Sequence, residues 1–132
     1  DAATEPWIGV NPNHVEINAA EEFDDPDSVY SFYKKLIAMR HDSATVATGE
    51  WNLVAADSEQ VYAFTRTSGD DTILVIVNLT DRTAQVPAEV AQLLEDGVGE
   101  SQVLLSTYDA VHSVKSVARG ELARWEGVVI QL

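Results

Sequence analysis

Residues 60–79 read QVYAFTRTSGDDTILVIVNL, and this stretch decides the fold class of the chain. Its first half alternates between two faces, with Tyr62 and Phe64 on one face and smaller residues on the other. The sequence Ser-Gly-Asp-Asp at residues 68–71 is typical of a tight turn, and residues 72–79 are apolar on both faces. The pattern predicts a β-hairpin whose second strand lies in the centre of a sheet.

Further stretches of strand character follow the same pattern before and after this hairpin. They are residues 50–55, 83–86, 102–106 and 122–132. Residues 87–99 fit either a helical turn or a loop, and residues 108–120 fit a loop with one short strand possible at 113–117. Because strands recur with no helix expected between them, we predict a mainly β chain, an antiparallel Greek-key β-sandwich over residues 45–132.

The N-terminal third has a different character. Residues 1–24 show no sustained period and are interpreted as a loop that is ordered only if it packs against something. A helix follows, with Asp25 as the predicted N-cap and Pro26 at its first position. Apolar residues between 29 and 40 cover about half of its circumference, and residues 41–43 end it. A face that wide indicates contact with more than one neighbouring element.

Charge and composition exclude several classes of partner. Among 132 residues, 22 are acidic and 8 are basic, which gives a net charge of −14. Such a chain suits neither nucleic acid nor an anionic membrane surface. The absence of cysteine excludes disulfides and thiolate zinc sites, and no apolar run is long enough to span a membrane. We expect a cytoplasmic protein that needs no cofactor, although the cysteine count does not decide the compartment.

No arrangement of residues predicts a catalytic or metal site. The adjacent acidic pairs are Glu21-Glu22, Asp24-Asp25 and Asp70-Asp71. Adjacent carboxylates do not converge on one reacting atom, so these pairs are interpreted as solvated turns. The histidines are His14, His41 and His112. They stand in separate contexts without metal-ligand spacing, and neither a nucleophile elbow nor a phosphate-binding glycine loop is present.

The tryptophans are the remaining candidates, because their rings can stack on sugars. Trp51 and Trp125 stand in strand patterns and are predicted to lie in the core or an interface. Trp7 stands in the opening loop and is the better candidate for an exposed, substrate-binding side chain, although a weak one.

The N-terminal third contains four motifs: PWIGVNPN at 6–13, IN at 17–18, DPDSV at 25–29 and FYKKLIAMR at 32–40. Together they resemble the end of the catalytic barrel in glycoside hydrolase family 13, in its oligo-1,6-glucosidase and α-glucosidase subgroup. In that family this segment is the loop after the eighth barrel strand and the last barrel helix. The resemblance therefore implies that residues 1–44 are a remnant of a (β/α)8 barrel, with one α-helix left over.

The rest of the chain resembles the C-terminal β-domain of the same family. Residues 61–66 and 73–81 are similar to its central hairpin, and residues 122–132 to its closing strand. Arg124, Trp125 and Gly127 depart from the Pro, Tyr and Ala that are usual in that strand. The resemblance implies that residues 45–132 are an α-amylase-type C-terminal β-sandwich.

The resemblance also implies a function for a longer parent protein. The catalytic aspartate, glutamate and second aspartate of the family lie upstream of these motifs, so none is assigned here. The parent would hydrolyse α-glucosidic bonds of oligosaccharides with retention, as part of carbohydrate metabolism. This segment would be non-catalytic and would pack on its own catalytic barrel, and the barrel-facing surface could support self-association.

Two alternatives remain open at this point. A carbohydrate-binding β-sandwich module would carry aromatic side chains in line on one solvated sheet face. A stand-alone interaction domain would dimerise through the helix, but it would leave the motif at residues 6–13 without a role.

Overall fold

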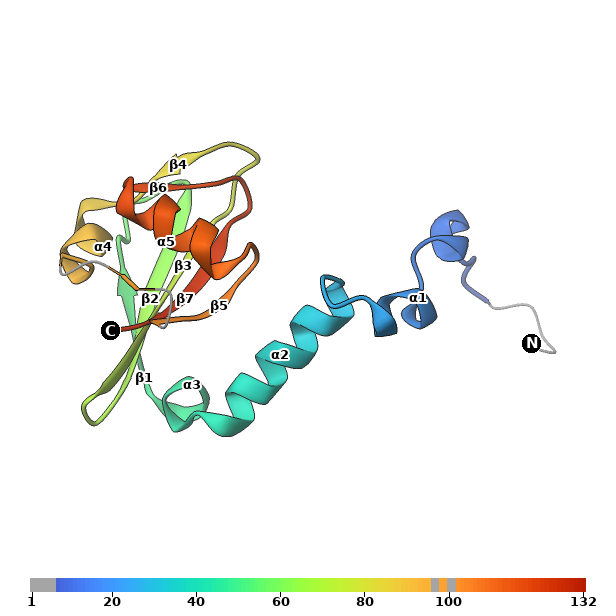
Figure 1. Cartoon of the computed structure of the whole chain (residues 1–132), viewed down its shortest axis with the longest axis horizontal. Coiled ribbons are helices and arrows are strands. Elements are labelled where there is room, and N and C mark those ends of the chain that lie inside the picture. The colour runs from blue at the N-terminus through green and yellow to red at the C-terminus, as the bar shows by residue number, and fades with distance from the viewer. Residues whose placement is uncertain (1–6, 96–97, 100–101) are drawn as a thin grey trace. The chain divides into compact units, whose positions relative to one another are not determined.

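The computed structural model describes residues 7–95, 98–99 and 102–132, so Pro6 of the first motif lies outside the described residues. The chain divides into two units, Asp1–Ile37 and Ala38–Leu132 (Figure 1). In the described part of the chain, no helix combines the length and the apolar character needed to cross a membrane.

The first unit contains short helices where a loop was expected. They are η1 at Pro12–Val15 and α1 at Ala19–Asp24. The side chain of Asn18 caps α1 by accepting hydrogen bonds from the backbone N–H groups of Ala20 and Glu21 at 3.1 Å. The prediction of a loop without regular structure is wrong here: the Asn18 cap and the alanine and glutamate residues of the first turn favour a helical start.

Helix α2 spans Val29–Asp42, and its N-cap is Ser28. The Ser28 hydroxyl accepts a hydrogen bond from the backbone N–H of Ser31 at 3.1 Å, and the first helical backbone bond is accepted by the Ser28 carbonyl. The predicted N-cap, Asp25, is wrong: its carboxylate accepts from the N–H of Asp27 at 2.9 Å and holds a turn before the helix.

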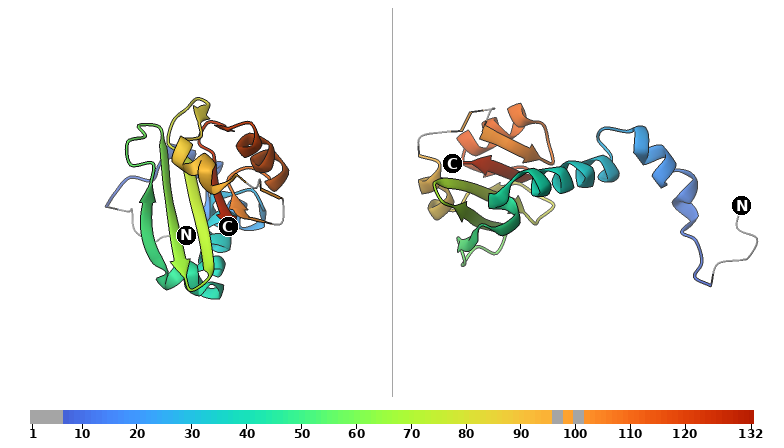
Figure 2. Two further views of the ribbon diagram at one scale, coloured as in Figure 1. Left: turned by 90° about the vertical axis from the view of Figure 1, so that its left-hand side faces the viewer. Right: turned by 90° about the horizontal axis from the view of Figure 1, so that it is seen from below.

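The second unit is built on a five-stranded antiparallel sheet. Its neighbouring strands run in the order β1, β2, β3, β7, β5, and Figure 2 shows the first three side by side. They span Glu50–Val54, Val61–Ser68, Asp71–Asn78, Gly127–Gln131 and Val103–Ser106, respectively. The short helix α3, Ala44–Thr48, precedes β1.

The hairpin predicted from residues 60–79 is confirmed. Strands β2 and β3 pair from Val61 opposite Asn78 to Ser68 opposite Asp71. Gly69 in the turn has φ of 62°, a left-handed conformation that glycine adopts without steric cost. Strand β3 is the central strand of the sheet, as its apolar character on both faces indicates.

A second layer covers one face of this sheet. It consists of strands β4 (Ala84–Gln85) and β6 (Glu121–Leu122), which pair with each other, and of helices α4 (Ala88–Leu93) and α5 (Ala110–Ala118). The ambiguous segment after residue 86 thus forms a helix. The mainly antiparallel fold class is confirmed, but the loop or strand expected at 108–120 is wrong.

Local capping explains helix α5. The Asp109 carboxylate accepts a hydrogen bond from the backbone N–H of His112 at 2.8 Å, so this N–H group of the first helical turn has an acceptor. The valines of this segment favoured a strand in the prediction, because β-branched residues are more common in strands. Packing of one helix face on the sheet overrides that preference.

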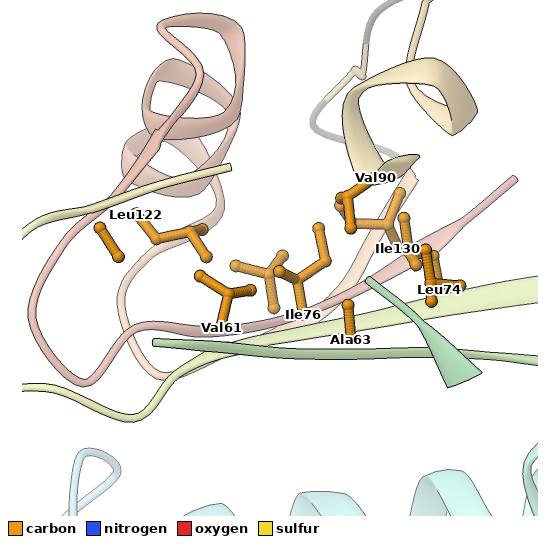
Figure 3. Packing of buried hydrophobic residues seen from close by; sticks show 10 residues of the cluster. Val61, Ala63, Leu74, Ile76, Val90, Leu122 and Ile130 are labelled. Carbon is orange, nitrogen blue, oxygen red and sulfur yellow. The ribbon is translucent and has the colours of Figure 1, made fainter. Parts of the chain in front are cut away.

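The hydrophobic core lies between the sheet and the second layer. Figure 3 shows Val90 of α4 and Leu122 of β6 on the same side of the sheet as Leu74, Ile76 and Ile130. All five side chains are fully buried. This face of the sheet is therefore closed, and further binding would have to use the opposite face or the loops.

The closing strand is interrupted, in contrast to the single strand predicted for residues 122–132. Between β6 and β7, the backbone turns at Ala123–Glu126, where the N–H of Glu126 bonds to the carbonyl of Ala123 at 3.2 Å. Trp125 occupies this turn with φ of 54°. A residue whose backbone is in the left-handed conformation cannot continue a strand, so β7 begins only at Gly127.

Candidate functional site

A group of polar side chains in the second unit surrounds Glu126, which is fully buried. Its Oε1 accepts a hydrogen bond from the Ser113 hydroxyl at 2.8 Å, and its Oε2 accepts one from the backbone N–H of Ala123 at 2.6 Å. His112 Nε2 lies 3.7 Å from Oε2. This carboxylate therefore joins helix α5 to the turn before β7.

The geometry of this group does not match that of a catalytic relay. His112 Nε2 faces both the Ser116 hydroxyl, at 3.3 Å, and Glu126. A Ser-His-acid relay uses the two different ring nitrogens for these two partners. The Ser113 and Ser116 side chains are also buried, so a substrate could not reach them. The group acts as a structural link, and sequence reasoning missed it because helix α5 was not predicted.

The acidic pairs have local structural roles. Glu22 Oε2 accepts from the backbone N–H of Tyr30 at 3.1 Å. Asp71 accepts hydrogen bonds from the Thr45 hydroxyl and, at 2.7 Å, from the side-chain amide of Gln131. Asp70 stands in the β2–β3 turn. The interpretation as turns therefore holds for Asp25 and Asp70, whereas Glu21, Glu22 and Asp24 lie in α1 and Asp71 begins β3.

The histidines stand in three different elements, as the sequence indicated. His14 belongs to η1, where its Nδ1 lies 3.0 Å from the Asn11 carbonyl oxygen, and His41 lies in the last turn of α2. His112 lies in α5. Across the described ranges, no group of three or more His, Cys, Asp or Glu side chains is placed to hold a metal ion.

The tryptophans are all exposed. Trp7 is 94% exposed, as expected for the candidate in the opening loop. Trp51 and Trp125 were predicted to lie in the core or an interface; at 49% and 58% exposure neither lies in the core, and the interface stays a prediction. Trp51 lies on the edge strand β1, and Trp125 lies in the turn before β7.

An aromatic row lies along β2 and the edge strand β1, on the face of the sheet opposite the core. The ring centroids of Trp51 and Phe64 are 6.3 Å apart, and those of Phe64 and Tyr62 are 5.5 Å apart. By cross-strand register, Val75, Val77 and Val129 lie on the same face. We call this surface, made by these aromatic and valine side chains, the outer sheet face.

The polar side chains at the margin of the outer sheet face are bonded within the chain. Arg66 Nε donates to the carbonyl of Thr45 at 3.2 Å. The Gln131 side-chain amide donates to Asp71 and to the Thr72 carbonyl, at 2.7 and 3.0 Å. The surface offered by this face is consequently apolar over β1, β2, β3 and β7, which suits a protein surface more than a polar ligand.

Helix α2 also exposes an apolar stripe. Val29, Tyr33 and Ile37 follow one another at intervals of four residues and are 66%, 61% and 55% exposed. All residues of α2 are described, and none of them is buried. The wide apolar face predicted from the sequence is present, and within the first unit this stripe remains open to solvent.

Two family models match consecutive parts of the chain. Residues 2–49 match the catalytic domain of α-amylase, and residues 52–110 match the C-terminal domain of maltogenic amylase. The oligo-1,6-glucosidase of Parageobacillus thermoglucosidasius is 33% identical over 129 residues, which cover 96% of this chain and 22% of that enzyme. A glucan 1,6-alpha-glucosidase of Streptococcus dysgalactiae subsp. equisimilis is 35% identical over 80 residues, 61% of this chain and 15% of that enzyme.

Solved structures give the same assignment. The trehalulose synthase MutB from Pseudomonas mesoacidophila MX-45 superposes with a TM-score of 0.73 at 32% identity, over 96% of this chain and 22% of that one. The chain therefore belongs to the α-amylase family of glycoside hydrolases, family 13. Within it, the chain corresponds to the C-terminal region of oligo-1,6-glucosidase-like enzymes, and it spans about a fifth of the length of these relatives.

Proposed function

We propose that this chain is the non-catalytic C-terminal part of an enzyme that hydrolyses α-glucosidic bonds in oligosaccharides. The observation that carries the proposal is the order of the two family matches, with the end of a catalytic domain followed by a C-terminal domain. The name of the Parageobacillus relative supports an α-glucosidic substrate for the parent enzyme. The substrate itself would be bound by the parent's catalytic domain, with Trp7 of this chain as a candidate contact.

We further propose that residues 1–44 belong to the catalytic barrel and residues 45–132 to the C-terminal domain. The bonding of Thr45 supports this division. Its hydroxyl donates a hydrogen bond to Asp71, and its carbonyl accepts one from Arg66. Both partners belong to the β2–β3 hairpin, so Thr45 is bonded to the sheet of the second unit. A cytoplasmic location stays part of the same proposal.

The proposed role of the C-terminal domain is to cover and stabilise the catalytic domain through the outer sheet face. An apolar surface of this kind on a soluble protein is typical of an interface. Trp51 and Tyr62 stay 49% and 42% exposed, although their rings are amphipathic anchors that are common at interfaces. In the absence of a catalytic domain, the same face would favour pairing with a second copy of the chain.

A carbohydrate-binding module is the second candidate function, and the aromatic row of Trp51, Phe64 and Tyr62 favours it. Sugar recognition also needs polar groups beside the rings, because each hydroxyl of the sugar must be hydrogen-bonded. On the outer sheet face the neighbours are valines, and Arg66 is already bonded to Thr45. Packing on protein is therefore the stronger proposal for this face.

The test compares hydrolysis of p-nitrophenyl α-glucoside by this chain and by the product of the complete reading frame that encodes it. We expect activity in the longer product and none in the chain alone. Activity in the chain alone would overturn the non-catalytic role. A longer product that folds but hydrolyses no α-glucoside would overturn the proposed activity of the parent.

A further inference from the structure

Trp125 is exposed in a turn that several other elements hold in place. Its backbone N–H donates to the carbonyl of Thr80 at 3.0 Å, and its carbonyl accepts from the Thr107 hydroxyl at 3.2 Å. The preceding carbonyl, of Arg124, accepts a hydrogen bond from the Tyr108 hydroxyl at 3.0 Å. Loops from three parts of the chain thus meet at this turn, and the indole is 58% exposed at their meeting point.

The conformation of Trp125 is unfavourable for its residue type. Its φ of 54° lies in the left-handed region, where glycine is free and a bulky side chain is strained. The buried carboxylate of Glu126 and the side chain of Asn78, which donates to the Ala123 carbonyl at 2.8 Å, hold the turn in this shape. A strained residue whose side chain contributes nothing to the core is a reason to look for a binding role.

The surroundings of Trp125 differ from those of the outer sheet face. Tyr108 is 38% exposed, and its ring stacks on His112 with centroids 4.5 Å apart. Arg124 and, in the loop of Thr80, Asp81 are exposed. An exposed indole next to the exposed Arg124, in a turn that is bonded to the loops of Thr80 and Tyr108, suits a ligand that has an apolar ring face and a rim of hydroxyl groups.

We propose that Trp125, supported by Tyr108, is a surface site on which a glucosyl ring of an α-glucan stacks. The choice of a glucosyl ligand rests on the proposed function, whereas the location rests on the exposure, the backbone conformation and the polar neighbours of Trp125. This site lies in the turn just before β7, and Trp125 is not one of the side chains that define the outer sheet face.

The test follows the indole N–H signals of the isotope-labelled chain by NMR during titration with isomaltotriose. The chain has 3 tryptophans, and single Trp→Phe variants assign their signals. We expect the Trp125 signal to shift with a dissociation constant in the millimolar range, while those of Trp7 and Trp51 stay in place. Sorbitol, which has hydroxyl groups but no pyranose ring, serves as the control ligand and should cause no shift.

The variant Trp125→Gly separates binding from folding. Glycine relieves the left-handed strain, so the melting temperature should be maintained or rise, while the affinity for isomaltotriose falls by at least about tenfold. Trp51→Gly is the matched control and should keep the wild-type affinity. A shift at Trp51 or Trp7 instead, an equal response to sorbitol, no response, or undiminished binding by Trp125→Gly would each overturn the proposal. These readouts do not involve hydrolysis, so their failure is distinguishable from failure of the proposed function.

Discussion

The hydroxyl of Ser113 donates a 2.8 Å hydrogen bond to Oε1 of Glu126, and both residues are fully buried. The two residues belong to helix α5 and to the turn before β7, so one carboxylate connects the second layer to the sheet. Removing a buried polar partner leaves its donors without a bond, which costs more than the bond itself contributes.

Glu126→Ala should therefore destabilise the second unit by about 2 to 4 kcal/mol, since the Ser113 hydroxyl and the Ala123 N–H lose their acceptor. The measurement is chemical denaturation followed by circular dichroism. Glu89→Ala, at an exposed position of α4, is the control and should change the free energy of unfolding by less than about 0.5 kcal/mol. Equal effects of the two variants would contradict the structural role of Glu126.

Asn78 is a second buried link, and its replacement by Asp should be damaging. Its side-chain NH2 donates to the carbonyls of Arg82 and Ala123 at 2.7 and 2.8 Å, and its oxygen accepts from Thr80. A carboxylate in this place would face two carbonyl oxygens without a donor. We expect Asn78→Asp to lower the free energy of unfolding by about 3 kcal/mol or more at neutral pH. A melting temperature within a degree or two of wild type would contradict this.

Gly49 is required for steric reasons. A Cβ atom at this position would lie 2.5 Å from the carbonyl oxygen of Thr45 and 3.0 Å from that of Thr67. Gly49→Ala should therefore cost about 1 to 3 kcal/mol, because backbone atoms would have to move. At Gly127 the same atom would make ordinary contacts with Thr107 and Val77 at 3.6 and 3.7 Å. Gly127→Ala is thus the matched control, and a similar loss in both variants would argue against the steric explanation.

Shortening a buried side chain of the core should leave a cavity and lower the free energy of unfolding. Leu74→Ala, in the central strand β3, is expected to lower the free energy of unfolding by about 2 to 5 kcal/mol. Leu104→Ala removes the same atoms from a position that is 43% exposed and should cost much less. The difference in the free energy of unfolding between the two variants shows how completely Leu74 is buried between the sheet and the second layer.

The outer sheet face predicts self-association of the isolated chain. Sedimentation velocity at increasing concentration should detect dimers, because an uncovered apolar face finds a partner. Tyr62→Lys and Trp51→Lys place charges at exposed positions of this face and should shift the chain toward the monomer. If the wild-type chain stays monomeric throughout the concentration range, this face does not drive association by itself.

The sequence was sufficient for the elements that depend on local pattern. The alternation in β2, the glycine turn and the doubly apolar β3 each predict their own structure, and the register of the hairpin follows from them. The family motifs predicted the fold class, and they predicted that the N-terminal segment resembles the end of a catalytic domain. Helix α1 was missed, although Asn18 followed by Glu21 is a recognisable helix start.

The parts that could not be predicted depend on tertiary contacts. Helix α5 forms from valine-rich sequence because its serine-bearing side, with Ser113 and Ser116 buried, packs toward Glu126 and the sheet. The left-handed Trp125 is stable only because Thr80, Thr107 and Glu126 hold the surrounding turn. The sequence pattern predicts a loop with one possible short strand for the first segment and a continuous strand for the second, since the groups that decide both structures are distant in the chain.

The position of β7 has a consequence for synthesis of the protein. Strand β7 lies between β3 and β5, although it follows both in the chain. While the ribosome still holds Gly127–Gln131 in its exit tunnel, β3 and β5 each present an unpaired strand edge. The emerging domain is therefore exposed to edge-to-edge association with neighbouring nascent chains until β7 leaves the tunnel.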